Sequence, residues 1–376
     1  MPELPEVESF RRLLLPLVSS STTLSFELTS DKPPKSFVSQ DDVAALNNKT
    51  YLIDVKRKGK RICMVLKCMH MHNMNMHTEK IRNQDHFYLF LHMGMTGRIS
   101  TPDHVPRLES LGSEDYPPKY THIKFNCGEE EACFSDPRKF GWVVLKPSLE
   151  DGFGELAPDA LDVMQVDVQG LIDQRLSIKA LLLDQKRVMC GVGNWVADEV
   201  LYQSMIHPEQ KQLSEEQADL ILSKTREILT EAVNCLDRRD TFPCSWLFHS
   251  RWSKRSATKG SAVKDAEGRK LAFITAGGRT SAIVPSIQKL NLKQAQQPTK
   301  KVAGTVSKVA KGKEEKPTKN SWEASRKALS VDAMEKETKP AKRISTSKDR
   351  KRKTETTGTV SEAPRRSRRK RPRVPT

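Results

Sequence analysis

The sequence predicts an α+β protein: a β-sandwich or barrel led by one helix, followed by a helical domain. Over the first 148 residues a helical start precedes many short β-like runs, an order typical of a sandwich or barrel. From residue 167 the apolar residues recur at helical spacing. The last 84 residues lack the apolar content that a core needs. We therefore divide the chain into residues 1–148, a connecting segment 149–166, residues 167–240, residues 241–292 and a tail at 293–376.

The N-terminal domain is predicted to begin with a helix. Pro2 occupies a first-turn position that tolerates proline, and Glu3 and Glu6 suit the positive end of a helix. Apolar residues then follow at helical spacing from Val7 to Val18. The β-like runs, most of them separated by turn-forming residues, are residues 24–28, 51–55, 62–66, 87–93, 122–126, 132–135 and 142–145.

A stretch rich in histidine and methionine, residues 69–86, interrupts this pattern. Two interpretations remain open. One is a soft-metal site for copper or zinc, and the other is a surface loop of biased composition.

The second half is predicted to be mostly helical. Residues 149–164 are acidic and rich in turn formers, which indicates an interdomain loop. Residues 195–202 form a helix with Asn194 as its N-cap. A longer helix starts at Ser214 and carries an apolar stripe at residues 222, 225, 229, 232 and 235–236. Two β-like pieces follow around residues 242–252 and 271–275, and a glycine turn, Gly277-Gly278-Arg279-Thr280, comes after the second.

The net charge of +17 belongs entirely to the tail. Residues 293–376 hold 26 of the 64 Lys and Arg residues and 9 of the 47 Asp and Glu residues, which leaves 38 of each sign in the rest. The tail is therefore expected to be disordered. Its clusters at 350–353 and 365–371 suit nuclear import receptors or phosphate backbones, and a solvated tail without a specific partner is the alternative.

Other classes of protein are excluded by composition. No apolar run approaches the roughly 20 residues of a membrane helix, and no secretory signal precedes the first helix. The seven cysteines show no pair at the two-residue spacing of a zinc knuckle. We therefore expect free thiols in a reducing compartment, no metal and no cofactor.

The N-terminus carries the sharpest chemical feature. Methionine before a small residue is normally removed, so Pro2 is expected to present a free secondary amine. Such an amine attacks an aldehyde-like carbon to give an iminium, and the neighbouring Glu3 can move protons. An ordinary helix start is the alternative when these residues are considered alone.

Several motifs, in order, resemble the formamidopyrimidine-DNA glycosylase family, which removes oxidised bases from DNA. They cover about residues 1–292, and their amino-acid sequences are similar to those of the fungal and plant branch of the family. They are Met1-Pro-Glu-Leu-Pro-Glu-Val-Glu8, Lys58-Gly59-Lys60, His92-Met93-Gly94-Met95-Thr96-Gly97, Asp136-Pro137-Arg138-Lys139-Phe140-Gly141, Gly191-Val-Gly-Asn-Trp-Val-Ala-Asp-Glu199 and Phe273-Ile-Thr-Ala-Gly-Gly-Arg-Thr280.

The resemblance implies a base-excision enzyme with an attached lyase activity. Pro2 would attack C1′ of the damaged nucleotide, Glu3 would act as general acid and base, and Lys60 would contact the lesion phosphate. Arg279 would grip the lesion's phosphates and assist δ-elimination. For Glu6, a role in catalysis and a role in capping the helix are equal alternatives. For Lys60, the alternative is an exposed lysine in a turn.

The resemblance further implies residues that bind double-stranded damaged DNA. Met95, Arg138 and Phe140 would fill the gap left by the flipped base, although core packing is the alternative for Met95 and Phe140. His92 and Asn194 would contact phosphates. Tyr120 stands where the family often has histidine, so the family does not settle its contact.

The resemblance also implies a helix–two-turn–helix domain with a finger. Most bacterial relatives fold that finger around zinc held by four cysteines, but no cysteine follows Cys244 here. We therefore expect a zincless β-hairpin built from residues 246–252 and 271–275. Its packing residues would be Trp246, Phe248, Trp252 and Phe273.

The sequence thus predicts a nuclear, monomeric glycosylase and lyase acting on oxidised purines, chiefly formamidopyrimidines. Two alternatives remain: an inactive DNA- or chromatin-binding protein on the same fold, and a glycosylase that prefers oxidised pyrimidines. The sequence also leaves open whether 8-oxoguanine is a substrate.

Overall fold

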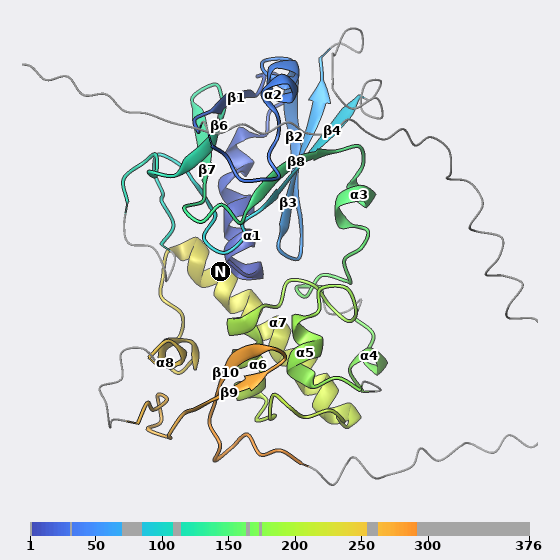
Figure 1. Ribbon diagram of the computed structural model, residues 1–376, viewed down its shortest axis with the longest axis vertical. Helices are drawn as coiled ribbons and strands as arrows, with labels where there is room; N and C mark the ends of the chain where they lie inside the picture. Colours follow the sequence, from blue (N-terminus) through green and yellow to red (C-terminus); the bar gives the residue numbers. More distant parts are fainter. Residues whose placement is uncertain are drawn as a thin grey trace, which may run out of the picture. The chain divides into compact units, whose positions relative to one another are not determined.

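Two antiparallel four-stranded sheets make up the N-terminal half of this computed structural model (Figure 1). The strand orders are β1-β6-β7-β5 and β2-β3-β4-β8. These strands are β1 Ser25–Leu28, β2 Thr50–Lys58, β3 Arg61–Cys68, β4 His86–His92, β5 Arg98–Ser100, β6 Thr121–Cys127, β7 Glu130–Ser135 and β8 Trp142–Lys146. The structure describes residues 2–30, 32–69, 85–107, 114–162, 166–172, 175–253 and 262–291. Most of the Met/His-rich stretch and the basic tail therefore lie outside the described residues.

Helix α1 (Leu4–Leu13) contributes to the core between the two sheets. Val7, Phe10 and Leu14 join buried side chains of both sheets in one cluster. The predicted helix ends earlier than expected, because Pro16 lies in the short 3-10 turn η1 (Leu15–Leu17) and cannot continue an α-helix. The sequence also missed a short helix, α2 (Gln40–Leu46), whose N-cap Ser39 accepts a hydrogen bond from the Asp42 amide.

The second half is helical, as predicted. Its helices are α3 Leu149–Phe153, α4 Gln169–Ile172, α5 Ile178–Leu183, α6 Asn194–Gln203, α7 Glu215–Arg238 and α8 Phe248–Arg251. The long helix α7 begins with a reciprocal Ser214/Gln217 capping box and buries the predicted apolar stripe. α7 also packs against α1, so the two halves share an interface.

Two predictions about local structure in this half are wrong. Residues 149–164 do not form a loop throughout, since Ser148 caps α3 by accepting a hydrogen bond from the Asp151 amide. Asn194 is the first residue of α6 rather than its N-cap, which is Gly193. The α6 amides find their acceptor in another part of the chain, which local sequence does not reveal.

The predicted finger hairpin contains one of its two expected strands, the one at residues 271–275, and pairs it with a different partner. β9 (Ala272–Ala276) pairs with β10 (Arg279–Ile283), and the pair Ala276–Arg279 closes a two-residue turn at Gly277-Gly278. Both glycines have positive φ, as this hairpin turn requires. The expectation of a strand at residues 246–252 is wrong, because α8 occupies that place. A short apolar run is compatible with either structure.

The aromatic residues expected to support the finger belong to two clusters. Trp246 and Phe248 pack with Trp195 and Phe242 in the core of the helical domain. Phe273 packs elsewhere, against a cluster formed by Tyr202, Leu247, Ala282 and Val284. Trp252 is 43% exposed and meets Phe248 edge to face.

Among the described residues, no helix has the length and apolarity needed to cross a bilayer.

Candidate active site

The start of α1 lies against the start of α6. Pro2 is buried, and the Glu3 side chain is 2% exposed. The Glu3 carboxylate accepts hydrogen bonds from the amides of Trp195 and Val196 at 2.9 and 3.0 Å. These are orphan donors at a helix N-terminus, where a carboxylate is electrostatically favoured. A glutamate 192 residues away in sequence thus serves the helix that lacks a side-chain cap of its own.

Glycine is required at the turn before α6. A Cβ on Gly193 would lie 2.2 Å from the Glu3 carboxyl carbon, and one on Gly191 would lie 2.3 Å from Leu4 Cδ1. Gly191 also has a φ of +107° and accepts a hydrogen bond from the Leu4 amide at 3.2 Å. The turn therefore accommodates the N-terminal segment because it has no side chains there.

Glu6 lies within the same contact. Its Oε2 accepts a hydrogen bond from the Glu3 amide at 2.9 Å, and its Oε1 accepts one from the Trp195 indole at 3.1 Å. Burial, and then the negative charge of Glu3, raise the pKa of Glu6 to about 7. Glu6 is thus a carboxyl group that titrates near neutrality beside Glu3, and the sequence had singled it out only weakly.

Lys60 reaches this contact from the β2–β3 turn. Its Nζ donates to the Val192 carbonyl at 2.9 Å. Burial lowers the pKa of Lys60, the carboxylates of Glu3 and Glu6 raise it, and the charge of Arg279 lowers it further. Lys60 is partly buried, so the exposed-turn alternative is wrong. Glu3, Glu6 and Arg279 thus all lie within electrostatic reach of Lys60.

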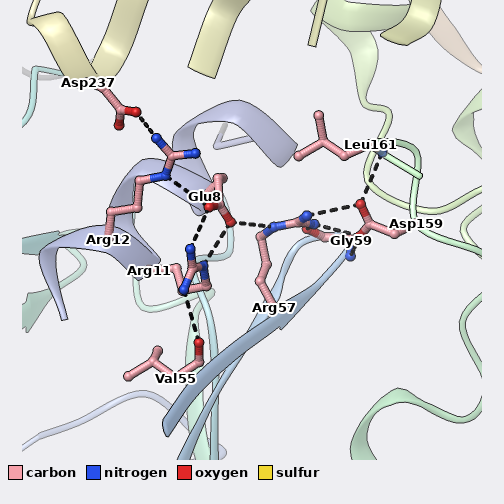
Figure 2. A network of polar contacts seen from close by, with 9 residues as sticks. All are labelled: Glu8, Arg11, Arg12, Val55, Arg57, Gly59, Asp159, Leu161 and Asp237. Atoms are coloured by element: carbon pink, nitrogen blue, oxygen red, sulfur yellow. Dashed lines mark hydrogen bonds and ion pairs between the residues drawn. The ribbon is translucent and has the colours of Figure 1, made fainter. Parts of the chain in front are cut away.

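A polar network fixes the Lys60 turn (Figure 2). Arg57 donates to both oxygens of Asp159 at 2.6 and 2.9 Å, and the Gly59 amide donates to Asp159 as well. Arg57 also donates to Glu8 in α1 at 2.9 Å. The turn is therefore attached both to the first helix and to the segment that leads into the second half.

Arg279 is exposed at the start of β10, directly after the glycine turn. The turn itself lies on α5, since a Cβ on Gly277 would come within 3.0 Å of the Ala180 nitrogen. Asn194 donates its side-chain Nδ2 to the Thr280 carbonyl at 3.1 Å, while its Oδ1 is buried without a partner in the structure. Asn194 thus binds the hairpin and does not cap its own helix.

The loops that carry Met95, Arg138 and Phe140 pack together at Gly94. A Cβ there would lie 2.4 Å from the backbone of Phe140 and Gly141. Buried Asp136 joins the two loops, because Oδ1 accepts from the Thr96 hydroxyl at 2.6 Å and Oδ2 from the Gly141 amide at 2.7 Å.

The exposure of these loop residues argues against core packing. Phe140 is 56% exposed, and the Arg138 guanidinium lies 4.8 Å from its ring centroid. Met95 is only partly buried. The core-packing alternative is therefore wrong for Phe140, and an exposed phenyl–guanidinium pair is available to a ligand.

His92 and Tyr120 have different surroundings. His92 Nδ1 accepts from the Gly94 amide, and its ring stacks on Trp142 at 5.4 Å. Burial, helped by the charges of Arg61 and Lys60, lowers the pKa of His92 to about 4, so His92 is neutral at pH 7. Tyr120 is 42% exposed, with the Lys119 ammonium 5.5 Å from its ring centroid.

The hairpin does not suit a zinc site. No cysteine follows Cys244 and no histidine follows His249, so β9 and β10 contain no thiolate or imidazole ligand. Within the described ranges, no three His, Cys, Asp or Glu side chains gather as metal ligands.

Comparison with known proteins indicates the same family in each successive part of the chain. Three family models match: the formamidopyrimidine-DNA glycosylase N-terminal domain at residues 1–143, the H2TH domain of the same proteins at 156–241, and a glycosylase-like C-terminal domain at 246–285. A formamidopyrimidine-DNA glycosylase of Arabidopsis thaliana is 35% identical over 80% of this chain and 74% of its own length. One from Prochlorococcus marinus is 32% identical over 60% of this chain and 76% of its own.

Solved structures share the fold. The MutM (Fpg) protein of Thermus thermophilus is 26% identical, with a TM-score of 0.53, and the match covers 77% of this chain and 100% of that one. The Lactococcus lactis Fpg protein, solved with DNA containing an N7-benzyl-Fapy-dG, gives a TM-score of 0.55 at 24% identity and the same coverage.

Proposed function

The chain belongs to the formamidopyrimidine-DNA glycosylase family, and from that premise we propose that it is a bifunctional DNA glycosylase and lyase of base excision repair that removes oxidised purines, chiefly formamidopyrimidines. The observation that carries the proposal is the junction of α1 and α6, where Glu3, the neighbour of Pro2 in the chain, lies with Glu6 and within electrostatic reach of Lys60. Two carboxyl groups and a cation therefore lie beside the residue proposed as the nucleophile.

The proposed reaction starts at the Pro2 nitrogen, which becomes a free secondary amine when Met1 is removed. Its lone pair forms a bond to C1′, the C1′–N bond to the damaged base breaks, and the base leaves with a proton. The sugar ring opens to an iminium, which draws electrons from C2′. Loss of a 2′ proton then expels the 3′ phosphate, and a second elimination expels the 5′ phosphate. Glu3 moves protons in these steps, with Glu6 beside it as a second carboxyl group.

The remaining residues are proposed to hold DNA. Arg279 and Lys60 bind the phosphates around the lesion, and neutral His92 donates a hydrogen bond to one of them. Asn194 extends this phosphate contact, and the exposed Tyr120 lies on the DNA-binding surface. The target base must leave the stack, and Met95, Arg138 and Phe140 fill the gap, which suits their exposure. One chain carries all of these groups, so the proposal needs only a monomer.

The tail is proposed to add affinity for DNA and to direct the protein to the nucleus through an import receptor. Both proposals rest on its charge, 26 basic against 9 acidic residues.

Borohydride trapping on a duplex with a formamidopyrimidine lesion tests the mechanism. The wild type is expected to give a covalent adduct, and Pro2→Gly a much weaker one. An N-terminal extension, which turns the Pro2 nitrogen into an amide, is the matched control and should give no adduct. Equal trapping by Pro2→Gly, or none by the wild type, would exclude the proposed chemistry. Nicking of an abasic duplex separates an active lyase from an inactive DNA-binding protein.

A further inference from the structure

Asp198 in α6 is a buried carboxylate with partners from three other elements. It is 1% exposed and pairs with Lys179 of α5, which is fully buried. Its Oδ2 accepts from Arg251 Nη2 of α8 at 2.7 Å. From β10, the Ser281 hydroxyl donates to Oδ1 at 2.6 Å and the Ala282 amide donates to Oδ2 at 3.3 Å. Both oxygens are therefore shared between cations and the hairpin.

A buried cluster of charges like this one adds little to the free energy of unfolding. Desolvation of buried ions offsets most of their attraction, and apolar replacements often fold as well or better. Here two cations face one carboxylate, and burial lowers the pKa of Lys179. A role in fixing the position of its partners explains the cluster better than a gain in stability.

The hydrogen-bond partners of α6 show that the element held in position is the β9–β10 hairpin. Asn194, Asp198 and Tyr202 are spaced four apart and so lie on one face of the helix. Asn194 binds the Thr280 carbonyl, and Asp198 binds the next two residues of β10. Tyr202 hydrogen-bonds Asp265 and Arg269, in the segment that leads into β9. One helix face thus holds the hairpin at two successive turns, and the segment that leads into it at a third.

This attachment determines the direction of Arg279. Side chains two apart on a strand point to the same face, so Arg279 and Ser281 share a face of β10. Ser281 is fully buried against Asp198, whereas Arg279 is exposed near the start of α6, where Glu3 and Lys60 lie. Because the hairpin strands carry no metal ligand, these polar contacts are a means of fixing the arginine.

We propose that Asp198 is a positioning residue that acts through Ser281 and the Ala282 backbone to hold Arg279 at the active site. This inference rests on the proposed function for the role of Arg279. The attachment of the hairpin is independent of that role, and it can be measured without any reaction.

The test uses full-length protein and the variant Ser281→Ala, which leaves the ion pairs of Asp198 intact. Asp198→Asn is the second variant. Thr225→Ala is the matched control, because it also removes a buried hydroxyl, which donates to the Ile221 carbonyl within α7. Hydrogen exchange of residues 272–283 and the ratio of δ- to β-elimination products in single turnovers are measured for each.

Ser281→Ala should raise exchange in the hairpin about tenfold, because a hydrogen bond to a charged group is worth roughly that factor. It should lower the δ/β ratio in the direction of Arg279→Ala, and the double variant should be no worse than Arg279→Ala alone. Hairpin exchange like that of the wild type, or a product ratio like that of Thr225→Ala, would overturn the inference. If the wild type has no lyase activity, the proposed function fails, and the exchange of residues 272–283 alone decides whether Asp198 holds the hairpin.

Discussion

At the scale of single residues, the candidate site is a set of charges whose properties depend on burial. Glu3 is held by helix amides, Glu6 by the Glu3 amide and the Trp195 indole, and Lys60 by a carbonyl. Burial raises the pKa of Glu6 to about 7 and lowers that of Lys60. Both shifts favour the neutral form, and Glu6 can therefore gain or lose a proton near neutral pH.

Glu6→Gln should change how stability depends on pH. The folded pKa of Glu6, about 7, lies above its ordinary value, 4.5. Its contribution is therefore full below pH 4.5 and is lost as pH rises through 7. Chemical denaturation at several pH values should show the wild type losing unfolding free energy between pH 5 and 8 relative to Glu6→Gln. The unfolding free energy of the control Glu129→Gln, at an exposed position, should depend on pH in the same way as that of the wild type. The same pH dependence in Glu6→Gln would contradict the expectation.

The sequence predicted which residues gather here but not what holds them. Pro2, Glu3, Lys60 and Arg279 were identified by motif, and the structure brings Glu3, Lys60 and Arg279 within electrostatic reach. Trp195, Asp136 and Asp198 were missed as anchoring residues. The acidic pair Asp198-Glu199 inside an apolar helix was the available signal, since buried charges require partners.

At the scale of elements, the site depends on how α1 and α6 meet. The glycine turn before α6 admits the Glu3 carboxylate, which then satisfies the amides at the start of α6. Each helix start therefore requires the other, although they belong to different halves of the chain.

Gly193→Ala tests this contact, because the new Cβ has no room beside Glu3. We expect a loss of about 1–3 kcal/mol in unfolding free energy. A single-turnover rate about 100-fold lower should accompany it, since small displacements of reacting groups are costly. Gly170→Ala in α4 is the control, as its nearest neighbour, Val188 Cγ2, is 3.6 Å away. A normal rate in Gly193→Ala would show that the contact does not serve the chemistry.

The elements that the sequence predicted poorly are short ones. The long helix α7 was identified from its cap and apolar stripe, but residues 246–252 looked like a strand and are partly helical. The Phe248 amide donates to Glu199 at 2.9 Å, a contact 49 residues away that local pattern does not contain.

At the scale of the whole molecule, Glu8 links the two halves (Figure 2). It binds Arg11 and Arg12 in its own helix and Arg57 in β2, while Arg57 binds Asp159 and Arg12 pairs with Asp237 of α7. Burial works against ionisation of Glu8, but these arginines lower its pKa to about 2. Helix α1 is thus attached to both halves by ion pairs that centre on one carboxylate.

Glu8→Gln should remove an acid-sensitive part of the stability. The folded pKa of Glu8 is below its ordinary value, 4.5, so its contribution is present above pH 4.5 and is lost as pH falls toward 2. At pH 7 the variant should lose roughly 3 kcal/mol, because buried arginines lose their charged partner. Thermal melts from pH 7 to 2 should converge with those of the wild type at the acid end. A constant difference in melting temperature across this range would argue against the network.

The tail is tested separately from the folded part. Truncation after Leu292 should reduce the dependence of DNA affinity on salt, because fewer counterions are released, and should leave single-turnover chemistry unchanged. Neutralising only the cluster at residues 365–371 should give a partial effect. An unchanged salt slope together with an unchanged nuclear location would remove the role proposed for the tail.

The sequence by itself determined the fold class and the family and named the candidate site residues, because apolar period, capping residues and motifs are local properties. Only the tertiary structure decided that Glu3 serves α6, that Glu6 titrates near neutrality and that Asp198 holds the hairpin. These properties depend on burial and on partners that lie from about 80 to 190 residues away, and so they exist only once the chain is folded.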